Sequence, residues 1–424
     1  MFTKHAQKRH SFRTLRAIHA SREMIIGPEL PSSTAGTSSS SLAKRKRDEE
    51  EQQQRPDFTR LAAKYDYFAR HARRRTTTPG EKSDSDENDA TRGRATKRTR
   101  KTFIDFTSWQ ATHDLCRALL EENGVKNWSI PEGHLVPGFT QRRNYCEWVE
   151  SLLEKDGVRI EDENVRGVDV GTGASAIFAL LFTARHPKWD MFGTDITKEA
   201  VENARRNCLA AGAVECSRDE TTEQVDALDK SRRRISIREV AKRRSGVARR
   251  EEGEDEDEDK DEPPILDLDL FQEERVDFTV CNPPFFNTMS ESSQNPRTNF
   301  GGTAKENSCR GGELSFVRRM ILESRRVVAR NAPAPPPPKT TAETKKRSAV
   351  CADADADSSV RWFTTMVGSK ATLKMAKKTL REMKDVQKIR ETAFVQGRTR
   401  RWGLAWSFRK ANNTKAFVSS ITSI

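Results

Sequence analysis

Two short segments of the sequence carry residue types that could do chemistry. The first reads Asp-Val-Gly-Thr-Gly-Ala-Ser at positions 169–175, between an apolar run and an apolar helical pattern. Its glycines let the backbone turn tightly and approach a ligand, and the helix start that follows offers free N–H groups. No Gly-Lys-Ser/Thr follows, which argues against a phosphate-binding P-loop, and Ala176 replaces the third glycine of a dinucleotide fingerprint. We therefore expect a turn that binds another cofactor, with an ordinary tight turn as the alternative.

Acidic residues at this turn indicate which cofactor it suits. Asp169 precedes the glycines, and Asp195 ends the next apolar run along the chain. An acid before the glycines is the variant found in S-adenosylmethionine enzymes, whose cofactor carries a cationic sulfonium and an α-amino group. A carboxylate at Asp195 could accept both ribose hydroxyls; the alternative is a helix cap before Lys198. The pattern predicts that Asp169, Gly171, Gly173 and Asp195 contact S-adenosylmethionine.

The second segment follows another strand-like run, 278–281, and reads Asn282-Pro283-Pro284-Phe285-Phe286. The prolines stiffen the turn and remove two N–H donors. The Asn282 side-chain oxygen and the Pro283 carbonyl are then two acceptors at a strand end, able to hold both hydrogens of a planar amino group. Such an amine is a poor nucleophile until its lone pair is freed from the ring. A following aromatic side chain can stack on that ring, so positioning and electrostatics would do the catalysis.

The elements around both segments alternate between strand and helix patterns. Strand patterns lie at 165–170, 191–195 and 265–281, and helical patterns at 55–72, 114–122, 144–153, 198–211 and 313–330. A polar stretch, 214–262, contains one short strand candidate at 235–237, and 360–412 reads as strand, helix and strand. This order predicts an α/β fold with a doubly wound parallel sheet.

Composition sets the domain boundaries. Only 34% of the 424 residues are apolar while 33% are charged, so we expect long segments that cannot bury a core. We predict a disordered basic tail at 1–54, an N-terminal RNA-binding helix and linker at 55–101, a main domain at 102–412 and a tail at 413–424. Low-complexity insertions are expected at about 214–262 and 331–359. The formal charge of +13 favours a nucleic-acid partner, and without an 18-residue apolar run we expect no membrane span.

The combined motifs resemble the U6 small nuclear RNA-type adenine-N6 methyltransferases, a family that includes bacterial ribosomal-RNA adenine-N6 methyltransferases. Four further segments agree with this family and occur in the same order. They are Pro56–Tyr65, Arg142-Arg143-Asn144-Tyr145, RGGELSFVRR at 310–319, and Gln396–Thr399 followed by Arg401-Trp402 and the tripeptide WSF. The resemblance covers roughly 55–72, 102–213, 265–330 and 360–408.

This resemblance implies a Rossmann-like class I methyltransferase fold that transfers a methyl group from S-adenosylmethionine to N6 of an adenosine in structured RNA, with U6 small nuclear RNA as the expected substrate. Residue by residue, it assigns cofactor binding to Arg142, Gly171, Ser175, Asp195 and Asn282. Asn282 and Pro283 would hold the amino group, and Phe285 or Phe286 would stack on the base. Arg297, Arg398 and Arg401 would face the RNA. Asp195 stands where the family usually has Glu, and Thr298 replaces a second arginine after Arg297.

Two other functions remain open at this point. A protein glutamine N5-methyltransferase uses a similar Asn-Pro-Pro, followed by Tyr where this chain has Phe285. A catalytically silent RNA-binding protein could keep the fold. The basic block Lys44–Arg47 and a nuclear RNA substrate favour the nucleus, with the cytoplasm or mitochondrion as alternatives. No metal site is apparent, and His113 and His134 are interpreted as structural.

Overall fold

A parallel sheet forms the centre of the fold. The computed structural model describes residues 56–75, 101–214, 233–240, 262–288, 290, 301–331, 360–396 and 399–410. Five strands hydrogen-bond in the order β5-β6-β4-β3-β7, and every pairing among them is parallel. Their bounds are β3 Arg166–Val170, β4 Asp190–Asp195, β5 Ala213–Val214, β6 Arg233–Glu239 and β7 Phe278–Cys281.

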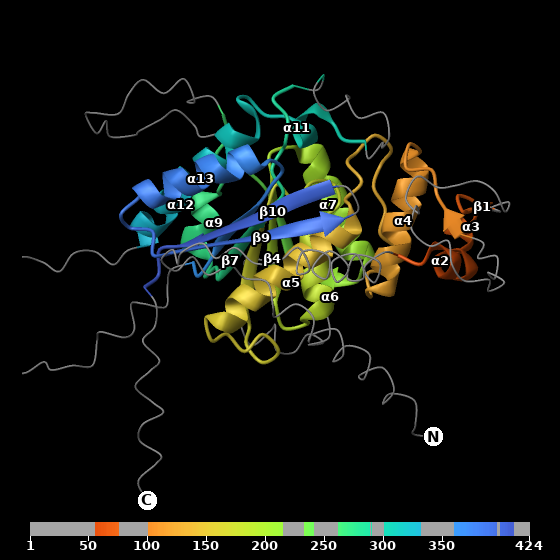
Figure 1. The fold of residues 1–424 in the computed structure, drawn as a ribbon. Helices are drawn as coiled ribbons and strands as arrows, with labels where there is room; N and C mark the ends of the chain where they lie inside the picture. Colours follow the sequence, from red (N-terminus) through yellow and green to blue (C-terminus); the bar gives the residue numbers. More distant parts are fainter. Residues whose placement is uncertain are drawn as a thin grey trace, which may run out of the picture.

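A second, three-stranded sheet continues beside β7 in the order β8-β10-β9, with β10 antiparallel to both neighbours (Figure 1). The junction is a parallel bridge between Phe278 and Trp362, where the Thr279 N–H donates to the Trp362 carbonyl over 2.9 Å. The bounds are β8 Phe363–Val367, β9 Lys388–Gln396 and β10 Thr399–Ser407. The chain goes from β3 to β4 and β6 on one side of the sheet and later returns to β7 on the other side of β3, so the reversal point lies between β3 and β7. In open α/β sheets, ligands bind beyond the carboxyl ends of the strands at this point.

Helices cover both faces of the sheet (Figure 1). One layer contains α5, α6 and α7, and the other contains α9, α12 and α13. Val280 belongs to the core under the first layer and its neighbour Cys281 to the core under the second, as strand alternation requires. The bounds are α4 Trp109–Glu122, α5 Phe139–Lys155, α6 Ile177–Arg185, α7 Lys198–Ala210, α9 Leu268–Glu273, α11 Ala304–Asn307, α12 Gly312–Asn331 and α13 Lys370–Glu382.

The N-terminal element packs on α4 at one side of the domain (Figure 1). It comprises α2 (Phe58–Lys64), α3 (Asp66–Ala69) and a ribbon of β1 (Arg73–Arg75) with β2 (Lys101–Phe103). Asp57 caps α2 by accepting the N–H groups of residues 59 and 60. The sequence predicted one helix, but Tyr65 is extended and divides it into two. Leu61 and Phe68 are fully buried, which fixes this element to the main domain.

Two sequence predictions need correction. The stretch 214–262 is not one insertion, because β6 within it pairs along its length with β4 and is the third strand of the doubly wound order. The short strand expected at 235–237 is thus confirmed but longer. In the final block, the expected strand, helix and strand are β8, α13 and a hairpin of two strands, β9 and β10.

Candidate active site

The cofactor turn directly follows β3 at the reversal point of the sheet. Gly171 and Gly173 have positive φ values of 68° and 60°, a backbone region that glycine adopts without steric cost. A Cβ added to Gly171 would meet no atom within 4 Å, so this side of the turn is open. Ala176, the residue before α6, also has a positive φ of 48°, a strained value for a residue with a side chain.

Asp169 lies beneath this turn and is almost fully buried. Its Oδ2 accepts a hydrogen bond from the Thr172 hydroxyl over 2.8 Å, while its buried Oδ1 has no hydrogen-bond partner among the described residues. Burial raises the pKa of Asp169 to about 7, the Thr172 hydrogen bond opposes this rise, and the negative charge of Asp195 adds to it. A cationic group placed beside the turn would therefore favour the ionised form.

Asp195 ends β4 on the other side of the turn. Its Oδ2 accepts the Gly173 N–H over 3.0 Å, and its Oδ1 accepts the N–H and hydroxyl of Thr197 over 3.0 and 2.9 Å. Burial raises the pKa of this carboxyl, while the hydrogen bonds oppose the rise. The α7 N-cap is Thr197, so the alternative of Asp195 as that cap is wrong. Asp195 fixes the position of Gly173, and its Oδ2 keeps one lone pair that accepts no hydrogen bond from the described residues.

Two residues that sequence reasoning missed brace the turn from behind. The Trp128 indole N–H donates to the Ser175 carbonyl over 2.9 Å. The Asn207 amide donates to the Ala174 carbonyl over 3.0 Å and accepts the Ser129 N–H over 2.9 Å. The expected cofactor residue Ser175 is buried in this brace. Neither contact could be found from sequence spacing, because each joins segments far apart in the chain.

Arg142, on α5, is buried on the same side of the sheet as the turn. No carboxylate lies within ion-pair distance of its guanidinium in the described part of the chain. Burial, with the positive charge of Arg401 nearby, lowers the pKa of Arg142 to about 10, while the charge of Asp169 opposes that change. A buried cation without an ion-pair partner is a favourable site for a ligand carboxylate.

The Asn-Pro-Pro turn follows β7, next to the cofactor turn across the reversal point. The buried Oδ1 of Asn282 has no hydrogen-bond partner among the described residues. Pro283 is buried and Pro284 is partly buried. The Phe286 N–H donates to the Asn307 carbonyl over 3.1 Å, and its carbonyl accepts the Cys309 N–H over 3.0 Å. The turn is thus held by the segment 307–309 while one amide oxygen of Asn282 stays available.

Phe285 lies between a glycine and an arginine. A Cβ on Gly368 would come within 2.7 Å of the Phe285 ring, so only glycine allows this approach. The Arg401 guanidinium lies over the same ring at 4.9 Å from its centre. Glu313, at the start of α12, accepts the Gly368 N–H. These contacts place Arg401 beside the turn.

The short helix α11 lies beside both turns and contacts residues around each of them. Glu306 on α11 contacts His134 Nδ1 over 3.2 Å and accepts the N–H groups of Leu135 and Thr303 over 3.3 and 2.7 Å. His134 is buried, and its Nε2 contacts Glu199 on α7 over 3.2 Å. His134 is therefore structural, as expected, and it joins two carboxylates, Glu306 and Glu199, that lie far apart in the sequence.

The fold brings most of the expected site residues together. Arg142, Asp169, Gly171, Gly173, Ser175 and Asp195 surround the first turn, and Asn282 to Phe286 form the second. Arg297 and Arg398 lie outside the described residues. Among those residues, no group of three or more His, Cys, Asp or Glu is placed to hold a metal ion. Within the same ranges, every helix is too short or too polar to cross a membrane.

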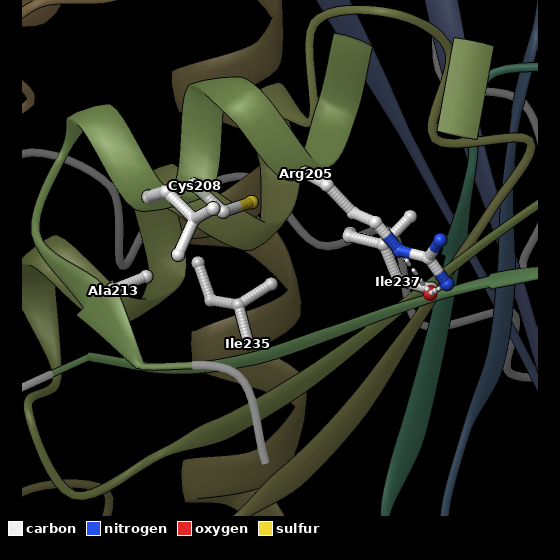
Figure 2. Close-up of a pocket in the computed structure, with 6 residues that line it drawn as sticks. Arg205, Cys208, Ala213, Ile235 and Ile237 are labelled. Carbon is white, nitrogen blue, oxygen red and sulfur yellow. Dashed lines mark hydrogen bonds between the residues drawn. The ribbon is translucent and has the colours of Figure 1, made fainter. Parts of the chain in front are cut away.

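A separate recess lies between α7 and the strands β5 and β6 (Figure 2). It is lined mainly by apolar atoms, and the Arg205 guanidinium at its rim donates to the Ile237 carbonyl over 3.2 and 2.8 Å. Its other lining residues are Cys208, Leu209, Ala213 and Ile235. The recess contains none of the expected site residues.

The two turns together can hold a cationic cofactor and a planar amine in adjacent positions, which suits transfer of a group between them. Comparison with known proteins agrees with this chemistry. A family model described as RNA methyltransferase matches residues 37–235, 257–332 and 349–410. The RNA N(6)-adenosine-methyltransferase METTL16 of Gallus gallus is 30% identical over 83% of this chain and 49% of its own length.

A relative from Dictyostelium discoideum, named U6 small nuclear RNA (adenine-(43)-N(6))-methyltransferase, is 27% identical over 73% of this chain and 50% of its own length. The chain thus spans about half the length of both relatives. The human METTL16 catalytic domain, solved in complex with MAT2A 3′UTR hairpin 6, superposes with a TM-score of 0.52 at 26% identity, covering 84% of this chain and 94% of that one. With a Rossmann-like sheet, both turns and a family match over most of its length, the chain belongs to this RNA methyltransferase family.

Proposed function

We propose that this protein transfers a methyl group from S-adenosylmethionine to the N6 amino group of an adenosine in structured RNA. The names of its relatives support adenosine in RNA as the acceptor. The Dictyostelium relative further supports U6 small nuclear RNA as the substrate and the nucleus as the location.

The observation that carries this proposal is the Asn282 side-chain oxygen. It is buried, it has no hydrogen-bond partner among the described residues, and it stands at a strand end beside the cofactor turn. An unmet buried acceptor costs about 1–3 kcal/mol, so its retention indicates a ligand donor. A planar exocyclic amine has two N–H groups to offer, and one would satisfy this oxygen.

The residues at the first turn fit the cofactor. Its α-amino and sulfonium cations suit the ionised forms of Asp169 and Asp195, and its carboxylate suits the buried Arg142. The open side of Gly171 leaves room for a ligand close to the backbone. When bound, S-adenosylmethionine supplies the activated methyl group. Asn282 would then orient the amine so that its lone pair points at that methyl.

The residues around the second turn would hold the base and its strand. Phe285 or Phe286 would stack on the adenine ring and keep it in line. Arg401, already beside Phe285, would neutralise a nearby phosphate. Arg297 and Arg398 are proposed to extend this RNA contact.

The test is methylation of U6 RNA by the purified full chain with labelled S-adenosylmethionine. A matched RNA would carry guanosine in place of the candidate adenosine. Label recovered as N6-methyladenosine from only the first RNA is the expected result.

Other outcomes would identify the alternatives. Label on glutamine of an added peptide, with none on RNA, would replace the proposal with a protein glutamine methyltransferase. RNA binding without any binding of S-adenosylmethionine would indicate a catalytically silent RNA-binding protein.

A further inference from the structure

The segment α11 contacts both turns through consecutive residues. The Asn307 carbonyl accepts the N–H of Phe286, which belongs to the Asn-Pro-Pro turn. Its neighbour Glu306 extends the other way, and its Oε1 lies 3.9 Å from where a Cβ would stand on Gly173 of the cofactor turn. Glu306 therefore lies where the two ligands would meet.

The Glu306 side chain is held firmly in this position. Its Oε2 accepts two backbone N–H groups, from Leu135 and Thr303, and the Thr303 hydroxyl accepts the Glu306 N–H in a capping box. The side chain is only 13% exposed. Because these two N–H groups hold Oε2, the other oxygen, Oε1, is directed toward His134 and the cofactor turn.

His134 contributes a compensating charge. Both of its ring nitrogens face carboxylates, Nδ1 toward Glu306 and Nε2 toward Glu199, each at 3.2 Å. A neutral imidazole can donate from only one nitrogen, so this arrangement favours the doubly protonated ring. The doubly protonated ring would place a positive charge 3.2 Å from the Glu306 carboxylate.

We propose that Glu306 is an additional cofactor-binding carboxylate, supplied by the segment that holds the Asn-Pro-Pro turn, which attracts the cationic part of S-adenosylmethionine. This inference rests on the proposed function. The unpartnered Oδ1 of Asp169, buried under the same turn, independently indicates a ligand at this place. Asp195, which accepts the Gly173 N–H, and Glu306 then both lie beside Gly173, and a ligand cation would offset their mutual repulsion.

The test measures binding directly by calorimetry, without activity. Glu306→Gln keeps the size of the side chain and one acceptor oxygen but removes the charge. We expect it to weaken S-adenosylmethionine binding roughly tenfold, as for loss of one charge–charge contact in a partly screened site. Glu199→Gln is the matched control, because it also loses a His134 contact and a negative charge but lies away from Gly173; it should bind like the wild type.

Binding of S-adenosylhomocysteine identifies the cation involved. This product lacks the sulfonium charge but keeps the α-amino group. A loss for both ligands assigns Glu306 to the α-amino group, and a loss for S-adenosylmethionine alone assigns it to the sulfonium; either supports the proposal. Raising the salt concentration should weaken the wild type more than Glu306→Gln, which a merely structural role would not produce.

Equal affinities of wild type and Glu306→Gln for S-adenosylmethionine would overturn this inference alone. If the wild type itself fails to bind S-adenosylmethionine, the proposed function fails instead. Thermal unfolding of each variant checks that α11 and the rest of the protein remain folded. Glu306→Asp is a second variant that retains the charge. Partial retention of S-adenosylmethionine affinity in Glu306→Asp supports the proposal, and an affinity as low as that of Glu306→Gln counts against it.

Discussion

The hydroxyl of Tyr145 lies 2.6 Å from the hydroxyl of Thr364, and the two oxygens connect α5 to β8 beside the Asn-Pro-Pro turn. Thr364 donates its own proton to the Thr279 carbonyl over 2.6 Å, so Tyr145 must be the donor to Thr364. Tyr145 in turn accepts the N–H of Cys281, the residue before Asn282, over 3.4 Å. This hydrogen-bond chain begins and ends on β7. It fixes the strand end from which Asn282 projects.

Tyr145→Phe should therefore affect both stability and catalysis. The change leaves the buried Cys281 N–H without an acceptor, so we expect a loss of about 1–3 kcal/mol in the free energy of unfolding. Methylation should fall about tenfold because Asn282 is less well positioned, while cofactor affinity stays near the wild-type value. Urea unfolding and single-turnover methylation measure the two effects. Tyr65→Phe, in the N-terminal element, is the control, and an equally slow Tyr65→Phe would remove the positioning role from Tyr145.

Asn282→Ala should abolish methylation while leaving cofactor binding largely intact. The amide oxygen is expected to stabilise the amine as its charge develops, and loss of one such group typically costs on the order of 10²–10³ in rate. Single-turnover methylation and calorimetry with S-adenosylmethionine give the two quantities. Full activity in this variant would exclude the amino-group role.

Arg398→Glu combined with Arg401→Glu should weaken RNA binding and flatten its dependence on salt. Each phosphate contact to a single strand contributes a slope of roughly 0.7 in log affinity against log salt. Binding of labelled RNA measured at several salt concentrations gives the slope. An unchanged slope would remove both arginines from the RNA interface.

The acid stability of the protein should depend on Asp114, which joins α4 to the N-terminal element. Burial alone would raise the pKa of Asp114, but hydrogen bonds to His113 and His71 lower it to about 2. Because the folded-state pKa lies below the unfolded value, the ionised carboxyl stabilises the fold above about pH 4. This contribution is lost as the pH falls from about 4 to about 2.

Thermal unfolding of the wild type and of Asp114→Asn across this range measures that contribution. The wild type should melt at a higher temperature at pH 6, and the difference should shrink toward pH 2. A difference that stays constant down to pH 2 would show that Asp114 acts through shape and not through its charge.

Both turns could be predicted from the sequence because each follows a short apolar strand, and because their glycines and prolines allow few other backbone conformations. The strand β6 was harder to delimit, since only Ile235 and Ile237 among its described side chains are buried, and three arginines, a serine and one glutamate make up the rest of the strand. The structural role of His134 was predicted, but the contacts of His134 and Asn207 were not. Their partners lie far away in the sequence, and only the fold brings Glu306 or Ala174 beside them.

Glu306 and Asn307 are adjacent residues, and adjacent Cα atoms are about 3.8 Å apart. Glu306 faces the cofactor turn and Asn307 holds the Asn-Pro-Pro turn, so a single peptide unit joins the contacts to the two proposed ligand sites. A shift of α11 caused by one ligand would therefore be transmitted to the other. Thermodynamic linkage then requires reciprocity: if the cofactor tightens RNA binding by some factor, RNA tightens cofactor binding by the same factor.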